Sequence, residues 1–346
     1  MRTVSGIRTT ITTLLFLAGC SSPEDDTPTL VDADGDGFDE SVDCNDESAS
    51  IHPGAEEFCD DQDNNCDGRI DEGMIQWVSD LPLGQQRLSI GQGVETVVET
   101  RGYDEDSLNS EEVFTYDSYG NLTQQDSFSY DELTHRRTLE HVLREDGQPS
   151  TSRTSWQQAS APDEVIEHLS THTYDEEGRL TERVTTRFDT GVVDEKLVRT
   201  WSENGQLQTE TRWATNGDDT LRLVELKTFT ALEQNQGSWD QDRYADGSIE
   251  RSVTYEVDDH GKLLWVEDDL LGYPITTTEF LYDDGDKLES TLTIGGPQDL
   301  MNSYAYSAED NLEESLKSQR YMENDWQQGG LRRMTFECAS LQDPTK

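Results

Sequence analysis

The chain has 346 residues, of which 74 are Asp or Glu and 26 are Lys or Arg, so its formal net charge is −48. Such a surface repels nucleic acid and anionic lipid and collects cations, which excludes a nucleic-acid-binding protein. Apolar residues make up only 32% of the chain, too few for one large ordinary core, but 7 Trp and 12 Tyr argue against general disorder.

The N-terminus predicts a secretory signal. Arg2 and Arg8 precede an apolar stretch over residues 11–17 that is too short to span a bilayer. The stretch ends in the letters LAGC at positions 17 to 20, which resemble the lipobox of bacterial lipoproteins. This resemblance implies a signal peptide over residues 1–19, cleavage before Cys20 and a lipid on Cys20. A lipid-anchored location at the outer membrane or cell surface is therefore expected.

Residues 20–31 are rich in Ser, Pro and acid and predict a tether, and residues 32–73 form an acidic segment. If Asp32 is position 1 of a twelve-residue loop, oxygen-bearing residues alternate and Gly37 stands at position 6, where a calcium loop needs a sharp turn. The candidate ligands are Asp32, Asp34, Asp36, the backbone carbonyl of Phe38, Glu40 directly or through water, and Asp43. Position 12 is Asp instead of the usual Glu, so whether Asp43 closes the loop with two oxygens is open.

A second copy of this pattern follows in the same segment. Asp63, Asn65 and Asp67 alternate before Gly68, and Asp71 and Glu72 are the candidate closing ligands. An acidic composition produces one such match easily, but two with Gly in the right place predict a site for a divalent cation.

The acidic segment resembles the metal-binding motif family related to the copper-binding protein MopE, which occurs in bacterial surface proteins. The resemblance rests on "DADGDGF", on "DCND" at 43–46, on "IHPGAEEFCD" at 51–60 and on "DNNCDGRIDE" at 63–72. Copper is the metal in the family's name, but copper sites favour His, Cys or Met, and only His52 lies nearby. Asp, Asn and carbonyl oxygens suit calcium, so Ca²⁺ is the expected ion, with copper as the alternative. The segment is expected to be unfolded without its ion.

Four cysteines remain after the signal: Cys44, Cys59, Cys66 and Cys338. An even set in an oxidising compartment predicts two disulfides, for which three pairings are open. The pairing that we favour joins Cys44 to Cys59 and Cys66 to Cys338, so that the acidic segment is tied to the end of the chain. Family members often carry a further Cys in the motif, which is absent here, and Cys338 is a candidate substitute.

Residues 74–346 contain repeats. Six units have an aromatic residue or Val followed six residues later by Leu: "YDSYGNL" at 116, "YDEEGRL" at 174, "WSENGQL" at 201, "VDDHGKL" at 257, "YDDGDKL" at 282 and "YSAEDNL" at 306. They predict hairpins with three-residue loops, in which Ser118, Tyr119 and Gly120 lie between strands and Tyr116 faces Leu122. The expected fold is mainly β, with antiparallel hairpin repeats in a curved sheet after a small loop-rich metal-binding segment.

Strand alternation is expected in these repeats, with residues 207, 209, 211 and 213 on one face and residues 206, 208, 210 and 212 on the other. The apolar alternation is too weak for a lipid-facing band, which argues against an outer-membrane barrel. The units resemble YD repeats of RHS proteins, and this resemblance implies a continuous curved antiparallel sheet. Large members form a shell around a toxin, but the units here are few and the sequence stops soon after Cys338, so we expect neither an enclosed cargo nor a toxin domain.

No catalytic motif stands out, so we expect no enzyme activity. His168 and His172 lie four apart, about 13 Å in a strand, which is too far to share a metal. The favoured hypothesis is a surface-anchored, non-catalytic lipoprotein with a calcium-binding acidic module and a β-repeat binding or structural domain. Its partners would be the membrane, through the lipid anchor, and a polysaccharide or envelope protein. The alternatives are a lipoprotein that captures copper or another metal, a carbohydrate-binding or toxin-associated YD-repeat protein, and an enzyme whose site needs a deep pocket.

Overall fold

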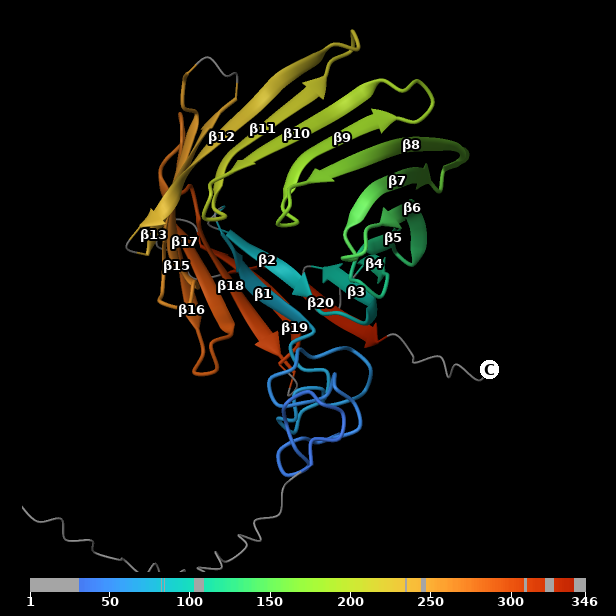
Figure 1. The fold of residues 1–346 in the computed structure, drawn as a ribbon. Coiled ribbons are helices and arrows are strands. Elements are labelled where there is room, and N and C mark those ends of the chain that lie inside the picture. The colour runs from blue at the N-terminus through green and yellow to red at the C-terminus, as the bar shows by residue number, and fades with distance from the viewer. Residues whose placement is uncertain are drawn as a thin grey trace, which may run out of the picture.

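The structure is a computed structural model that describes residues 31–81, 83, 85–102, 109–233, 235–243, 247–307, 310–320 and 327–338. The predicted signal peptide and Cys20 lie outside the described residues. All regular elements of the described residues are strands (Figure 1). Within these residues, no helix has the length and hydrophobicity to span a membrane.

In the described parts of the chain, twenty strands follow one another. They are β1 (Ile75–Asp80), β2 (Gln85–Ile90), β3 (Val94–Gly102), β4 (Ser110–Tyr116), β5 (Leu122–Ser129), β6 (Glu132–Leu143), β7 (Pro149–Gln158), β8 (Ala161–Tyr174), β9 (Leu180–Arg187), β10 (Val193–Trp201), β11 (Leu207–Thr215), β12 (Leu221–Glu233), β13 (Gln236–Asp242), β14 (Arg251–Val257), β15 (Leu263–Leu270), β16 (Thr276–Tyr282), β17 (Leu288–Ile294), β18 (Asp299–Tyr306), β19 (Leu312–Arg320) and β20 (Gln327–Cys338). This confirms a mainly β fold that begins after a loop-rich segment.

The strands β3 to β20 form one closed antiparallel barrel. Each strand pairs with the next along the chain, and β20 returns to β3, with Leu331 opposite Gly102 and Cys338 opposite Val94. The predicted curved antiparallel sheet is therefore confirmed, but its closure was not expected from the small number of units. Hairpins that all twist and coil in one sense bend a long sheet until its first and last strands meet, and the pairing then removes both free edges.

The predicted hairpin turns are confirmed. In the first unit, the backbone N of Asp117 donates to the carbonyl of Asn121, and the N of Gly120 donates to the carbonyl of Asp117, both at 2.9 Å. Tyr116 lies directly across from Leu122, and the other five units pair their first and seventh residues in the same way. Gly120 has φ of 77°, which explains the Gly at the fifth position. Asp286 and Asp310 adopt the same conformation in the units that lack it there.

One predicted face assignment is wrong. Trp201 pairs with Leu207 and Thr200 pairs with Thr209, so Gln208 is an extra residue in a bulge. The bulge turns Leu207 to the inner face, where it packs with Phe229 and Trp239. Leu207 therefore lies on the same face of the sheet as residues 210 and 212 and not on the face of Thr209. Simple alternation failed because a three-residue hairpin loop carries a bulge at its closing pair.

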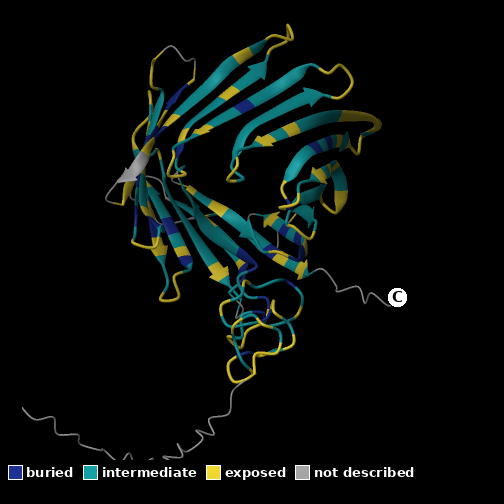
Figure 2. Ribbon diagram, in the orientation of Figure 1, coloured by how far each residue is buried: buried dark blue, intermediate teal, exposed yellow. Residues whose placement is uncertain are grey.

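The β1–β2 hairpin lies inside the barrel and supplies much of its core (Figure 1). Trp77 packs with Tyr304 of β18, and Leu83 packs with the cluster around Trp239 of β13. The Trp239 indole N also donates to the carbonyl of Leu83 at 2.9 Å. Three apolar clusters line this inner surface, and their buried members include Ile75, Val97, Tyr255, Leu263, Leu288, Leu312 and Met334. Elsewhere the strands are mostly half-buried, and exposed residues concentrate in the turns and in the acidic segment (Figure 2).

In four of the six units, the first residue has an aromatic side chain that bonds the unit to the hairpin before it. Their side chains donate to backbone carbonyls of the preceding unit: Tyr174 to Pro149 at 2.9 Å, Trp201 to Leu180 at 3.0 Å, Tyr282 to Leu263 at 2.9 Å and Tyr306 to Leu288 at 3.0 Å. Basic residues of the preceding unit lie over the same rings, for example Lys287 over Tyr306 and Arg144 over Tyr174. These contacts favour a packing role for the aromatics, because a cation over a ring and a buried hydroxyl bond both hold adjacent hairpins together.

Candidate metal centre

The first acidic loop is organised by its own aspartates. The carboxylate of Asp32 accepts the backbone N–H groups of Gly35 at 2.6 Å and Gly37 at 3.1 Å. Asp34 accepts from the N of Asp36, and Asp36 accepts from the N of Phe38. The bonds of Asp34 and Asp36 each close a turn two residues long, which is the usual way in which Asp bends the backbone, and those of Asp32 span three and five residues. Gly37 has φ of 106°, so the sharp turn predicted at this position is present.

The second loop repeats this pattern. Asp63 accepts the backbone N of Asp67 at 3.1 Å and the N of Gly68 at 2.8 Å, as Asp32 does with its glycines. Asn65 accepts from the N of Asp67, and Asp67 accepts from the N of Arg69. Gly68 has φ of 92°. The same local rule therefore shapes both copies of the motif.

Three carboxylates of the first loop converge. Oxygens of Asp34, Asp36 and Asp43 lie within 4.8 Å of one another, and so do oxygens of Asp32, Asp34 and Asp46. The backbone N–H groups of Val42 and Asp43 both donate to the carbonyl of Asp39, and this turn returns Asp43 to the loop. Asp43 is only 8% exposed. The loop thus surrounds a small volume with carboxylate oxygens, to which Asp43 contributes.

The oxygens of this cluster are not satisfied within the described residues. One Oδ2 each of Asp34, Asp36 and Asp43 is buried and has no hydrogen-bond donor. Partial burial, with the neighbouring charges of Asp36, Asp43 and Asp32, raises the pKa of Asp34. Buried anionic oxygens without donors are costly, and a cation between them removes that cost. An all-oxygen set with several carboxylates fits a hard ion such as calcium better than copper.

The remaining predicted ligands have different positions. Glu40 is exposed and lies in none of the convergent carboxylate groups of the described residues. Phe38 stacks its ring on His52 with the centroids 5.1 Å apart. Asp71 is 7% exposed and accepts the backbone N–H groups of Asp60 and Asp61, so its carboxylate holds a loop instead of facing the second turn.

The second loop has its own acidic partners. Glu72 accepts the side-chain amide of Asn65 at 2.6 Å, and its other oxygen is buried without a donor. Glu57 accepts the backbone N–H groups of Asn65 and Asp71, and burial raises its pKa. Sequence reasoning missed Glu57, and it missed Asp46 in the first loop. Both lie within the stretches that carry the MopE resemblance, "IHPGAEEFCD" and "DCND", so those stretches held the signal.

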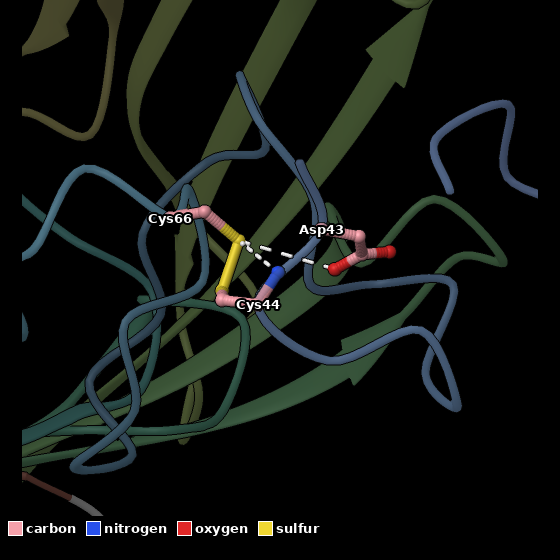
Figure 3. Close-up of side chains that lie close together, drawn as sticks. All are labelled: Asp43, Cys44 and Cys66. Carbon is pink, nitrogen blue, oxygen red and sulfur yellow. Dashed lines mark hydrogen bonds between the residues drawn. A yellow bond between two sulfur atoms is a disulfide. The ribbon is translucent and has the colours of Figure 1, made fainter. Parts of the chain in front are cut away.

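Two disulfides are present, but their pairing differs from the favoured one. Cys44 is joined to Cys66, and Cys59 to Cys338. The first bond connects the two acidic loops, and its Cys66 sulfur lies 4.0 Å from an oxygen of Asp43 (Figure 3). The pairing of Cys44 with Cys59 is therefore wrong. Cysteine spacing could not show that the two loops fold side by side, so that Cys44 and Cys66 meet.

The acidic segment is anchored to the barrel (Figure 1). Asn311, which is 3% exposed in the turn between β18 and β19, accepts from the backbone N of Ile75 and donates to the carbonyl of Asp71. Arg69 of the second loop forms an ion pair with Asp310 in the same turn. The Cys59–Cys338 bond adds a covalent link to the end of β20. The acidic loops and the barrel are therefore mechanically connected.

Comparison with known proteins supports one part of this site. Residues 43–72 match a protein family described as "Putative metal-binding motif". No curated protein sequence matches the chain.

Solved structures show distant likeness in fold alone. A porin-like protein from Bacteroides uniformis is 12% identical, with 71% of this chain and 97% of that chain covered and a TM-score of 0.37. A protein of unknown function from Bacteroides fragilis is 11% identical, with 36% and 87% covered and a TM-score of 0.26. The Tc holotoxin pore of Photorhabdus luminescens is 12% identical, with 61% of this chain but 14% of that chain covered and a TM-score of 0.24. None of these is close enough to indicate a function.

Proposed function

We propose that the acidic segment is a calcium-binding module that braces the base of a surface-anchored, non-catalytic β-barrel. The observation that carries this proposal is the convergence of Asp34, Asp36 and Asp43, each with one buried oxygen that lacks a donor. A calcium ion takes six to eight oxygens, and these three with Asp32, Asp46 and a backbone carbonyl would supply such a set. Extracellular sites of this type bind calcium at about 10⁻⁴ to 10⁻³ M, so the ion acts as a structural part.

The role of the ion follows from the connections of the module. The Asn311 hydrogen bonds, the Arg69–Asp310 ion pair and the Cys59–Cys338 disulfide link the loops to β19 and β20. Ordering the loops with calcium therefore supports the strands at the closure of the barrel. At about 10 mM calcium, binding with these affinities stabilises the folded chain by about 1.4 to 2.7 kcal/mol.

The cation proposal is tested on the purified mature protein by calorimetric titration with calcium and with copper, and by thermal melts with calcium or EGTA. We expect calcium binding in the range given above and a melting temperature that falls in EGTA. Tight copper uptake together with stability that is independent of calcium would instead support the alternative function, metal capture.

We further propose that a lipid on Cys20 holds the protein at the outer membrane or cell surface, where the barrel contacts a polysaccharide or an envelope protein. Ion pairs such as Arg136–Asp126 and Arg153–Glu167 lie on the outer side of the sheet, which favours contact with water over contact with lipid.

The lipid anchor is tested by a Cys20→Ser variant, which should move from the membrane fraction to the soluble fraction. Unchanged membrane association of that variant would contradict the anchor.

A further inference from the structure

One side of the barrel interior is left open by the inner hairpin. The three apolar clusters contain residues of β3, β4 and β10 to β20 but none of β5 to β9. Against β6 to β10 lies a cavity of about 560 Å³, and a second cavity of about 420 Å³ adjoins it, with Trp156 and His168 in both linings. Both face inward, because Phe114 of the inner face pairs with Gln125, and Gln125 pairs with Arg137 of the cavity wall.

The charge of this cavity contrasts with the acidity of the whole chain. Its wall carries Arg137, Arg183 and the imidazoles of His141, His168 and His172, against the carboxylates of Asp194 and Glu195. Both carboxylates are already engaged. Glu195 pairs with Arg183 at 2.6 Å, and Asp194 contacts His168 at 2.9 Å and Arg187 at 2.7 Å.

Arg137 is left without an anion. Among the described residues, no carboxylate lies within ion-pair distance of its guanidinium, and its buried Nε has no acceptor. Burial lowers its pKa, which reflects the cost of this charge. Its neighbour Arg136 points to the outer side and pairs with Asp126 at 2.6 Å. The chain has 74 acidic residues, yet this inward-facing Arg pairs with none of the described ones. Its guanidinium is therefore a candidate binding group for the anion of a ligand.

The groups around Arg137 indicate which other chemical groups the anionic ligand contains. Its guanidinium carbon lies 4.9 Å from the centroid of the Trp156 ring, and that side chain is 41% exposed. The Nδ1 atom of His172 is buried without a partner in the described part of the chain. Thr154, Ser170 and Thr185 add hydroxyl groups to the wall. A flat apolar surface beside a cation, surrounded by hydroxyls and an imidazole whose Nδ1 has no partner, suits a polyhydroxylated ring with one acidic group.

We propose that this cavity binds a carboxylate-bearing sugar, with the carboxylate on Arg137 and the sugar ring against Trp156. The ligand class is therefore an acidic oligosaccharide that contains uronate units. The inference rests on the proposed binding role of the barrel and names its ligand, but it does not depend on calcium binding by the acidic segment.

The test is calorimetric titration of the full mature protein with trigalacturonate, in about 0.15 M salt where screening limits repulsion by the acidic surface to about 8 Å. EGTA is present so that calcium does not bridge sugar and protein. We expect saturable binding of trigalacturonate and none of neutral maltotriose. The Arg137→Gln variant should bind at least about tenfold more weakly, and Trp156→Ala should also lose affinity.

Arg136→Gln is the matched control, since it removes a charge one residue away on the outer side. It should bind as the native protein does, and thermal melts verify that each variant folds. Absence of binding to the native protein, equal binding of maltotriose, or equal affinity of Arg137→Gln and the native protein would each overturn the proposal. Competition by inorganic phosphate at the same concentration as the sugar would also overturn it and would indicate a general anion site. Calcium titration of the same samples shows separately whether the cation module functions.

Discussion

Asp34, Asp36 and Asp43 come from three points of one loop, and each keeps an oxygen buried without a donor. The three carboxylates repel one another when they lie this close together. This loop is therefore the part of the chain that a bound cation would stabilise most. Asp43 matters most among them because it is the most buried and lies beside the Cys44–Cys66 bond. Asp43, the residue at position 12 of the loop, therefore belongs to the cluster with Asp34 and Asp36.

Replacing Asp43 with Asn should weaken calcium binding at least about tenfold, equivalent to about 1.4 kcal/mol, because the variant loses a full negative charge but keeps the side-chain shape. Without calcium its melting temperature should not fall, since repulsion within the cluster decreases. Calcium titration and thermal melts in EGTA measure both effects. Glu40→Gln is the control and should leave the affinity unchanged; equal effects of the two substitutions would argue against the cluster as the site.

His172 is expected to make the stability of the folded chain depend on pH. Burial, with the charges of Arg183 and His141, lowers its pKa below the usual 6.5. Near that pH the folded state therefore binds fewer protons than the unfolded state. Its contribution to stability is present above about pH 6.5 and is lost as the pH falls through the folded pKa.

A His172→Gln variant should accordingly show a smaller loss of stability between pH 7 and pH 5 than the native protein. Urea unfolding at several pH values measures the difference between the two proteins, which cancels the contribution of the many surface acids. Parallel stability curves would contradict a role for His172.

At the scale of the elements, the hairpins depend on two devices. A residue with positive φ closes each three-residue loop, and in four units an aromatic side chain bonds to the previous unit. The first device is local and was readable as Gly at the fifth position of the repeat. The second joins residues that lie 18 to 25 positions apart and depends on how neighbouring hairpins stack.

Tyr306→Phe should lower the free energy of unfolding by about 1 kcal/mol, because it removes the hydrogen bond to the Leu288 carbonyl and keeps the buried ring. Urea denaturation of the native protein and the variant measures this change. Tyr273→Phe is the matched control at a 68% exposed position and should change stability little. A loss as large in the control as in Tyr306→Phe would show that the carbonyl bond is unimportant.

At the scale of the whole molecule, the two disulfides connect different parts of the structure. Cys59–Cys338 connects the acidic segment to β20, the strand that closes the barrel, across a sequence separation of 279. Cys44–Cys66 spans 22 residues and connects only the two acidic loops. Long loops lose the most chain entropy when they are crosslinked, so the first bond should matter more for global stability.

Replacing Cys59 and Cys338 together with Ser should therefore lower stability by about 2 to 5 kcal/mol. Replacing Cys44 and Cys66 should chiefly weaken calcium binding, because the loops lose their mutual alignment. Denaturant unfolding and calcium titration of both double variants separate these effects. A larger loss of stability in the Cys44 and Cys66 variant than in the Cys59 and Cys338 variant would contradict this prediction.

Sequence reasoning succeeded where the controlling interactions are local. The hairpin loop at residues 117–121 and the pair of Tyr116 with Leu122 follow from the turn chemistry of seven consecutive residues. It failed for Leu207, where a bulge changes the face, and for the disulfide pairing, where the partner is set by contact between loops. It also missed the approach of Asp46 and Glu57 to the predicted loops: the stretches that resemble MopE contain both residues, but their contacts depend on how the segment folds back.

The sequence by itself determined the strand-rich class, the repeated turns and the acidic alternation of the two loops, because periodicity and Gly positions act over a few residues. Only the tertiary structure decided that the sheet closes, that β1 and β2 fill part of its interior and that Arg137 lines a cavity without pairing with a carboxylate of the described residues. These features join residues far apart in the chain, and they depend on accumulated strand twist and on side-chain packing.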